Sequence, residues 1–205
     1  MALVHEFERT GNWLFKRRGW LPLFFILPAF VFMWFTDRIE YKPLTEFIFI
    51  AVGMIGLLIR ALTVGRTPEK TSGRNIKKQV ANQINTSGLY SVVRHPLYVG
   101  NFLMWLGPAL FLRSLWFTLG FCLLYWLYYE RIMFAEEQFL RKKFGEQYDL
   151  WSKNVRPFLP SFRNYKKPDL SFSIRNVLKR EYHGLATMII IFTFLDVDSI
   201  SIILH

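Results

Sequence analysis

Apolar residues occur in long blocks along this chain, and the basic residues fall between the blocks. A helix that crosses a bilayer needs roughly 20 consecutive apolar residues, and most of the blocks approach that length. The pattern therefore predicts an all-α fold, a polytopic transmembrane helical bundle with about five membrane segments. The predicted segments are residues 20–36, 44–64, 98–112, 114–134 and 185–204.

The first two predicted segments differ in how well they suit a membrane. The first is short and contains Pro22 and Pro28, so local bilayer thinning or flanking aromatic residues must help it to span. In the second, Gly53 and Gly56 offer a small-residue face for close helix packing. Arg60, near the end of the second segment, is predicted to reach the membrane interface.

The third and fourth segments are predicted to form a helical hairpin that turns near Arg113. The pair Gly107-Pro108 predicts a break or kink in the first arm of the hairpin. The second arm continues without a stop signal into a charged stretch and ends at Gly145, which suits a helix C-cap.

The two ends of the chain are predicted to lie at or in the membrane. Residues 1–19 form a weakly amphipathic stretch that suits the membrane surface, and they lack the apolar core of a cleavable signal peptide. The block at residues 185–204 contains Asp196 and Asp198, which cost about 2.5–3.5 kcal/mol each at a bilayer centre. We expect a fifth span there, and a helix lying in the interface is the alternative.

The composition agrees with a single membrane domain over residues 1–205, with its transmembrane core at residues 20–134. Hydrophobic residues make up 52% of the chain and aromatic residues 18%, yet the formal net charge is +11. Soluble nucleic-acid-binding proteins are also basic, but they do not usually carry this much Phe and Trp. We therefore expect no nucleic-acid partner.

The basic clusters predict a topology, because cytoplasmic loops carry an excess of Lys and Arg. Residues 16–18, 65–87 and 146–180 hold these clusters, and an even number of predicted spans separates each from the next. All three, and the N-terminus with them, are expected on the cytoplasmic side, at the inner membrane if the source is bacterial. In residues 146–180 aromatic residues are interleaved with the basic ones, which favours anionic lipid headgroups as partners.

Few residues suit a metal site. Cys122 is the only cysteine, so the chain has neither an intrachain disulfide nor a cysteine-based metal site. His5, His183 and His205 are scattered with no spacing typical of ligands, and we expect no metal.

A polar, turn-rich motif precedes the third predicted segment. It is residues 88–100, Gly-Leu-Tyr-Ser-Val-Val-Arg-His-Pro-Leu-Tyr-Val-Gly. Gly88 permits a tight turn, and Pro96 sets the start of the next helix. Arg94 and His95 are therefore expected just before a helix N-terminus at the membrane boundary. Basic side chains at such a place suit a carboxylate or a phosphate.

Aromatic residues flank this pair, since Tyr90 and Tyr98 lie on either side of it. A ligand could use both rings as apolar walls. The alternative is that His95 merely caps the helix, while the two tyrosines belong to the aromatic belt of the membrane interface.

A second charged motif follows the fourth predicted segment, within residues 129–140. Glu136 and Glu137 are adjacent there, and Arg131 lies five residues before Glu136. Adjacent helix residues point about 100° apart, so we expect the two glutamates to serve different tasks. One can face a ligand, while Glu137 has the spacing to pair with Arg141. The alternative is a solvated helix end.

Taken together, the motifs resemble those of the isoprenylcysteine carboxyl methyltransferase family and of the phospholipid methyltransferases related to it. The matching elements are residues 88–100, Glu136-Glu137-Gln-Phe-Leu at residues 136–140 and Phe-Gly-Glu-Gln-Tyr at residues 144–148. The resemblance covers residues 86–155, where it places the cofactor and catalytic motifs. It implies a small integral membrane enzyme that uses S-adenosylmethionine.

The resemblance also implies roles for single residues. Arg131 and Glu136 would be catalytic, facing the reacting centre and the lipid. The methionine end of the cofactor offers a carboxylate for a cation and an ammonium for a glutamate. The cofactor pocket would be lined by Tyr90, Arg94, His95, Tyr98, Gly100 and Glu137.

The expected reaction is transfer of the sulfonium methyl to an anionic oxygen, which is already ionised and needs positioning rather than a general base. Arg131 suits such an oxyanion because guanidinium binds it bidentately, and Glu136 would hold Arg131 in place. Among relatives of this type, some bacterial ones methylate the phosphate of lipid A, which is the most specific acceptor that the resemblance implies. Carboxyl methylation of isoprenylcysteine and N-methylation of a phospholipid amine are the alternatives.

Two further functions compete with this one. An NADPH-dependent sterol reductase shares a similar Arg-His-Pro and acidic pattern, but those proteins are generally longer. A small membrane scaffold or channel would carry polar residues along a path through the membrane, whereas here they gather at one boundary.

Overall fold

The structure is a computed structural model that describes residues 2–19, 27–29, 31, 43–68 and 79–203, with side chains as far as Leu195. These residues form helices and connecting loops without a β-strand, which confirms the all-α prediction. The α-helices are α1 (Ala2–Arg17), α3 (Pro43–Gly65), α4 (Pro96–Phe111), α5 (Leu115–Phe144), α6 (Glu146–Asn154) and α7 (Ile174–Ile203). Two short 3-10 helices, η1 (Gly88–Ser91) and η2 (Phe162–Asn164), lie in the loops.

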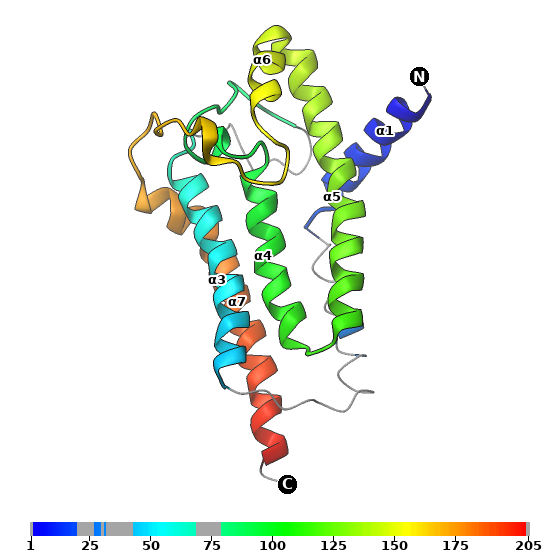
Figure 1. Cartoon of the computed structure of the whole chain (residues 1–205), viewed down its shortest axis with the longest axis vertical. Coiled ribbons are helices and arrows are strands. Elements are labelled where there is room, and N and C mark those ends of the chain that lie inside the picture. The colour runs from blue at the N-terminus through cyan, green and yellow to red at the C-terminus, as the bar shows by residue number, and fades with distance from the viewer. Residues whose placement is uncertain (1, 20–26, 30, 32–42, 69–78, 204–205) are drawn as a thin grey trace.

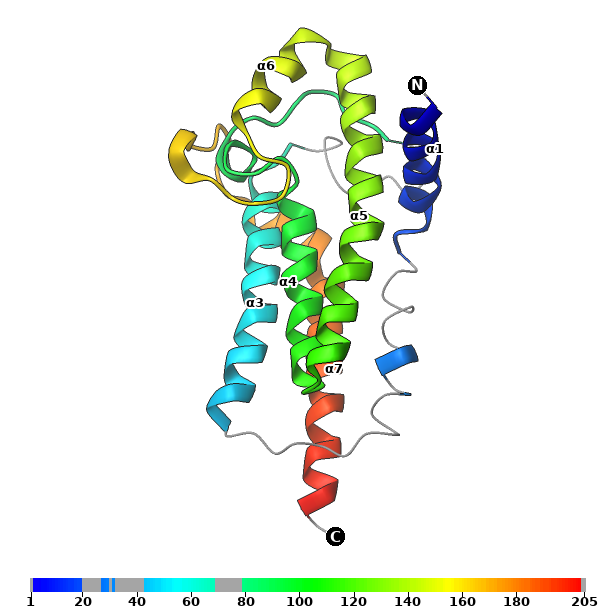
Figure 2. The same ribbon diagram turned by 45° about the vertical axis from the view of Figure 1, so that its right-hand side comes forward.

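Helices α3, α4, α5 and α7 run along the long axis of the molecule, with α4 between α3 and α5 (Figure 1). The short helix α6 and the loops around η1 and η2 gather at the end of the bundle where α4 begins and α5 finishes (Figure 2). Helix α1 packs against the half of α5 nearest that end. The end of the bundle that carries both charged motifs is therefore the one covered by α6 and the loops.

Helices α3 and α4 approach each other closely through small residues. A Cβ atom placed on Gly56 would lie 2.4 Å from the backbone nitrogen of Met104 and 2.5 Å from the carbonyl oxygen of Gly100. One on Gly107 would lie 2.8 Å from the carbonyl oxygen of Phe49. The predicted small-residue face of this segment is thus confirmed, with Gly53 placed beside Met188 of α7.

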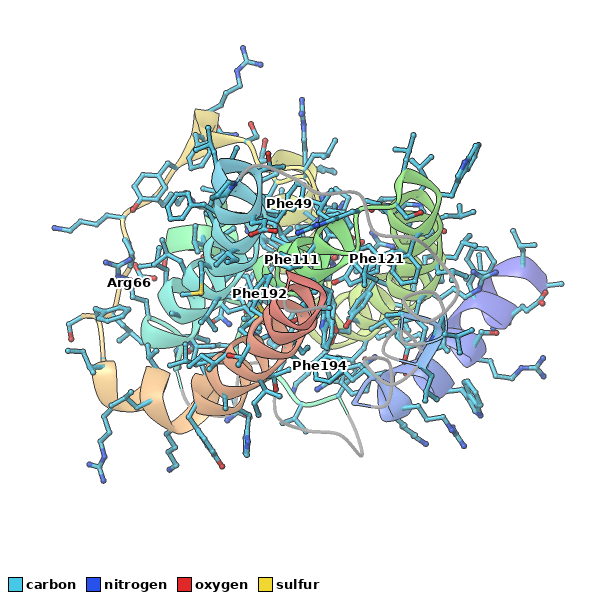
Figure 3. The ribbon with its side chains drawn as sticks, turned by 90° about the horizontal axis from the view of Figure 1, so that it is seen from below. Phe49, Arg66, Phe111, Phe121, Phe192 and Phe194 are labelled. Carbon is cyan, nitrogen blue, oxygen red and sulfur yellow. The ribbon has the colours of Figure 1, made fainter. Side chains whose placement is uncertain are left out.

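Two apolar clusters form the core. One lies between α3, α4 and α7, where the rings of Phe111 and Phe192 meet edge to face with centroids 5.7 Å apart, near Phe49 (Figure 3). The other lies between α1, α4 and α5 and is rich in aromatic residues. Its buried members are Phe15, Tyr98, Ala109, Phe121, Tyr125, Tyr129, Ile132 and Met133.

The predicted hairpin is confirmed, with one correction. Arg113 takes a positive φ of 62°, and Ser114 caps α5 by accepting a hydrogen bond from the Phe117 nitrogen. Helix α5 ends as predicted before Gly145, whose φ is 52°. The predicted break at Gly107-Pro108 is wrong, because α4 continues through Pro108 to Phe111. Pro108 removes one backbone hydrogen bond in the last turns of α4, and the close packing of Gly107 against α3 holds this part of the helix in place.

The membrane prediction is supported for one segment. Within the described ranges α3 is the one helix that is both long and apolar enough to cross a membrane, judged by length and composition. Most of the first predicted span, residues 20–36, lies outside the described residues. Helix α7 begins at Ile174, inside the basic segment 146–180 that was expected on the cytoplasmic side, and packs along α3. The side chains of Asp196 and Asp198 lie outside the described residues.

Candidate active site

The two charged motifs meet where the first turn of α4 faces the last third of α5. Pro96 begins α4 and His95 is its N-cap, as the sequence predicts. The loop that follows α6 holds this corner in place. The Arg94 nitrogen donates to the Arg156 carbonyl at 2.8 Å, and the His95 nitrogen donates to the Pro157 carbonyl at 3.2 Å.

His95 lies between the two adjacent glutamates. Its Nε2 atom is 3.0 Å from Oε1 of Glu137, and its Nδ1 atom is 3.6 Å from Oε2 of Glu136. Burial alone would lower the pKa of His95, but the hydrogen bonds and negative charges of Glu136 and Glu137 outweigh it and raise the pKa. An imidazolium bridging two carboxylates is the consistent charge state.

The two glutamates thus share one neighbour, His95, while Glu136 also contacts Tyr98 and Glu137 also contacts Arg94. Their side chains diverge along α5, but an imidazole has nitrogens on opposite edges and can meet both carboxylates at once. The predicted pair of Glu137 with Arg141 is absent among the described contacts, since Arg141 bonds Asp149 at 2.8 Å.

Glu137 also forms an ion pair with Arg94. The Nη1 atom of Arg94 donates to its Oε2 atom at 2.8 Å, and both side chains are mostly buried. Burial alone would raise the pKa of Glu137, but hydrogen bonding to His95 and the charges of His95 and Arg94 bring the pKa below its ordinary value. Glu137 is thus an ionised carboxylate held by two cations.

Tyr98 connects this cluster to the aromatic core. Its hydroxyl donates to Oε1 of Glu136 at 2.8 Å, and its ring stacks on the His95 ring with centroids 5.6 Å apart. On its other side the ring lies 4.8 Å from that of Tyr129. The structure thus brings together five of the residues that the sequence singled out, Arg94, His95, Tyr98, Glu136 and Glu137.

The other three predicted residues make their described contacts outside this cluster. The carbonyl of Tyr90 accepts a hydrogen bond from the Trp151 indole at 3.3 Å. Gly100 faces α3, where a Cβ atom would lie 2.6 Å from Cγ of Arg60. Arg131 turns toward α1.

Arg131 donates to the Leu127 carbonyl at 3.1 Å, and its guanidinium lies 5.1 Å from the centre of the Phe7 ring. The polar contacts of Glu136 are with Tyr98 and His95, so Glu136 does not hold Arg131 in the way that was expected.

Sequence reasoning missed Tyr148 as a site residue. Tyr148 is fully buried, and its hydroxyl lies beside Arg94 and Glu137. Burial is the main cause that raises its pKa, so the hydroxyl is neutral. Although this hydroxyl lies near Arg94 and Glu137, neither it nor the Nε atom of Arg94 makes a hydrogen bond of good geometry with the described residues. The available signal was its place in the Phe-Gly-Glu-Gln-Tyr motif at residues 144–148, for which no site role was predicted.

Metal ligands do not gather here. In the ranges that the structure describes, no group of three or more His, Cys, Asp or Glu side chains could hold a metal ion. The charges of the cluster instead compensate one another.

Comparison with known proteins places these residues in a shared region. The family model described as phospholipid methyltransferase matches residues 48–147. A probable protein-S-isoprenylcysteine O-methyltransferase of Oryza sativa subsp. indica is 32% identical over 137 residues, which cover 61% of this chain and 69% of the relative. No solved structure matches the chain.

Two further relatives match this chain over a smaller share of their own length. The protein-S-isoprenylcysteine O-methyltransferase of Schizosaccharomyces pombe is 34% identical over 95 residues, or 43% of this chain and 40% of the relative. The cobalt-zinc-cadmium resistance protein CzcN of Cupriavidus metallidurans is 32% identical over 117 residues, or 57% of this chain and 51% of the relative.

The family model contains all five clustered residues, and the model and the relatives from Oryza sativa and Schizosaccharomyces pombe are methyltransferases by name. A helical methyltransferase is therefore the class that the fold and the site define. The chain belongs to the isoprenylcysteine carboxyl methyltransferase and phospholipid methyltransferase family.

Proposed function

We propose that this enzyme transfers the methyl group of S-adenosylmethionine to an anionic oxygen on a membrane lipid or a lipidated acceptor. The observation that carries the proposal is the cluster of two carboxylates and two cations around His95. The methionine end of the cofactor is a zwitterion, with one ammonium and one carboxylate. A cluster that contains both carboxylates and cations can bind the ammonium and the carboxylate of the cofactor.

The residues present fit that group. Glu137 is the acceptor for the ammonium, Arg94 with His95 are donors for the carboxylate, and Glu136 faces the reacting centre. Tyr148 and the Arg94 Nε atom have hydrogen-bonding capacity that the described residues leave unused. A buried polar atom without a partner costs about 1–3 kcal/mol, so a ligand that pairs with these atoms recovers that cost.

When bound, the cofactor supplies a methyl group on a positively charged sulfur. The chain has to hold the two reactants in line, exclude water and stabilise the acceptor anion. Tyr98 fixes the Glu136 carboxylate, and α6 with the Trp151 contact to Tyr90 covers the cluster. Arg131 is the cation proposed to hold the acceptor oxyanion. No residue has to act as a general base, because the acceptor is ionised at neutral pH.

The names of the relatives favour a carboxylate as the acceptor. Those described as protein-S-isoprenylcysteine O-methyltransferases act, by that name, on a prenylated cysteine. We therefore place the carboxylate of a lipidated acceptor before the phosphate of lipid A, which no relative cited above carries in its name. N-methylation of a phospholipid amine ranks behind both, because an amine would be disfavoured near Arg131.

A lipid-borne acceptor requires access from a membrane, and the bundle surface supports this. Several large apolar side chains on the outer faces of the helices are exposed, among them Phe47 at 67%, Leu123 at 60% and Ile190 at 66%. Burying such faces in hydrocarbon is favourable. A multi-pass enzyme with a cytoplasmic N-terminus and site is thus the proposed arrangement.

The first test is calorimetric titration of the detergent-purified protein with S-adenosylhomocysteine. Micromolar binding is expected, and His95→Ala should weaken it at least about tenfold. His183→Ala is the matched control, because His183 is an exposed histidine of α7. Absence of binding to folded protein would refute the cofactor assignment.

The second test identifies the acceptor by transfer of a radiolabelled methyl group. N-acetyl-S-farnesylcysteine, a lipid A preparation and phosphatidylethanolamine are offered separately. We expect base-labile radioactivity in N-acetyl-S-farnesylcysteine, because a carboxyl methyl ester is hydrolysed by base. Radioactivity in lipid A or in phosphatidylethanolamine instead would identify that lipid as the acceptor and refute the proposed one.

A further inference from the structure

A second buried polar cluster lies on the face of α4 that meets α3 and α7. Arg60 of α3 binds Glu181 of α7 bidentately, with Nε to Oε2 at 2.7 Å and Nη2 to Oε1 at 2.8 Å. The Glu181 side chain is only 5% exposed and that of Arg60 21%. The prediction that Arg60 reaches the membrane interface is therefore wrong, because it points into the bundle.

Asn101 of α4 links this ion pair to the aromatic core. The remaining Nη1 atom of Arg60 donates to Oδ1 of Asn101, and Nδ2 of Asn101 donates to the Tyr129 hydroxyl at 3.5 Å. Guanidinium can only donate, so the amide oxygen must face Arg60 and the amide NH₂ must face Tyr129. The ion pair thereby determines which way Asn101 is oriented.

Ring contacts continue from Tyr129 to Tyr125 and Tyr98. Tyr125 donates its only proton to the Tyr98 carbonyl at 2.7 Å, and its ring stacks on that of Tyr129 with centroids 4.2 Å apart. The Tyr129 ring in turn lies against the Tyr98 ring, whose hydroxyl holds Glu136. A continuous set of contacts thus runs from Glu181 of α7 to Glu136 in the candidate active site.

We propose that Arg60, Asn101 and Glu181 are positioning residues that fix Tyr129 and Tyr98 and, through Tyr98, the Glu136 carboxylate. The inference rests on the proposed methyl transfer, for which Glu136 faces the reacting centre. Arg60 and Asn101 lie within the family match at residues 48–147, whereas Glu181 lies beyond it. Helix α7 thus supplies the counter-ion for an arginine of the shared region.

Stability alone does not account for the buried pair of Arg60 and Glu181, because apolar residues of similar volume often stabilise a fold equally well. Removing one partner strands a buried charge, but removing both does not. A pair that served packing alone could be replaced by two methionines without consequence. A pair that orients Asn101 could not, and this difference makes the inference testable.

The test compares the wild type with a double variant in which both Arg60 and Glu181 are replaced by Met. We expect Glu181→Met alone to lower the unfolding temperature and the double variant to restore it. The double variant should nevertheless lose kcat at least about tenfold, with the KM for S-adenosylmethionine unchanged, because misplacement of a group at the reacting centre costs rate. Asn101→Leu, which leaves the ion pair intact, should lose kcat to the same extent.

The matched control is the ion pair of Arg113 with Glu46, which lies at the other end of α3 and α4 from the candidate site. The double variant Arg113→Met with Glu46→Met should keep kcat. Wild-type kcat in Asn101→Leu, or in the double variant of Arg60 and Glu181, would overturn the proposal. An equal loss of kcat in the control pair would also overturn it, because stability alone would then explain the effect.

A readout without catalysis separates this inference from the proposed function. The near-ultraviolet circular dichroism of the stacked tyrosines should change in Asn101→Leu, while the far-ultraviolet spectrum stays that of the wild type. An unchanged near-ultraviolet spectrum refutes the positioning role. Absence of any methyl transfer by the wild type would instead refute the proposed function, with the spectral comparison still deciding the inference.

Discussion

The Nε2 atom of His95 lies 3.0 Å from Oε1 of Glu137, although the two residues are 42 positions apart in the chain. This contact joins the N-cap of α4 to the last third of α5. It turns two short motifs into one charged cluster, and the charge states of the two residues support each other.

The stability of the folded protein should depend on pH through the charge states of His95 and Glu137. The pKa of His95 is raised above 6.5, so its contribution is fully present below pH 6.5 and is lost as the pH rises through the pKa of the folded state. The pKa of Glu137 is lowered below 4.5, so its contribution is present above pH 4.5 and is lost as the pH falls through its folded pKa. Both contributions are complete between these two values.

Thermal unfolding of the wild type and of His95→Gln between pH 4 and about pH 9 measures this. The difference in unfolding temperature should be largest between the two ordinary pKa values and should shrink in the alkaline range. A difference that grows with pH would mean that His95 is neutral in the folded protein.

Tyr148→Phe should separate stability from cofactor binding. Its hydroxyl makes no hydrogen bond of good geometry with the described residues, so removing it should leave the unfolding temperature of the ligand-free protein equal or slightly higher. If the hydroxyl contacts the cofactor, affinity for S-adenosylhomocysteine should fall about tenfold, since a hydrogen bond to a charged group contributes roughly 1.5–3 kcal/mol. Unchanged affinity in calorimetry would remove Tyr148 from the cofactor site.

Arg131→Ala should abolish methyl transfer while binding of S-adenosylhomocysteine stays near the wild-type value. Arg131 lies apart from the His95 cluster and faces Phe7 of α1, so its loss leaves the charges of that cluster intact. Turnover in the radiolabel assay should fall at least about 100-fold, as for other groups that stabilise an oxyanion. Phe7→Leu controls for the packing of α1, and wild-type turnover in Arg131→Ala would disprove the acceptor assignment.

Gly56→Ala should destabilise the bundle. The added Cβ would meet backbone atoms of α4 at 2.4 and 2.5 Å, and backbone cannot rotate away. Overpacking of this kind costs about 1–3 kcal/mol. Gly120→Ala on α5 is the control, because nothing lies within 4 Å of the new Cβ there and alanine favours the helix by about 1 kcal/mol. Opposite shifts of the unfolding temperature are expected, and equal shifts would argue against the close contact of α3 with α4.

Local sequence was sufficient for the helices and for the neighbourhood of the site. Apolar block length predicted the all-α fold, Pro96 predicted the start of α4, and Gly145 predicted the end of α5. Gly53 and Gly56 indicated the packing face of α3. These features follow from backbone preferences and from the spacing of residues within one helix, which a sequence displays directly.

Tertiary packing alone decided which charged groups meet. His95 bridges Glu136 and Glu137, and Arg60 turns inward to Glu181, which is 121 positions away. Arg131 lies apart from the cluster that its spacing to Glu136 suggested it would join. A side chain's partner on another helix depends on the rotation and depth at which α3, α4, α5 and α7 pack. Periodicity within one segment carries no information about that relation, because it records only which face of its own helix a residue occupies.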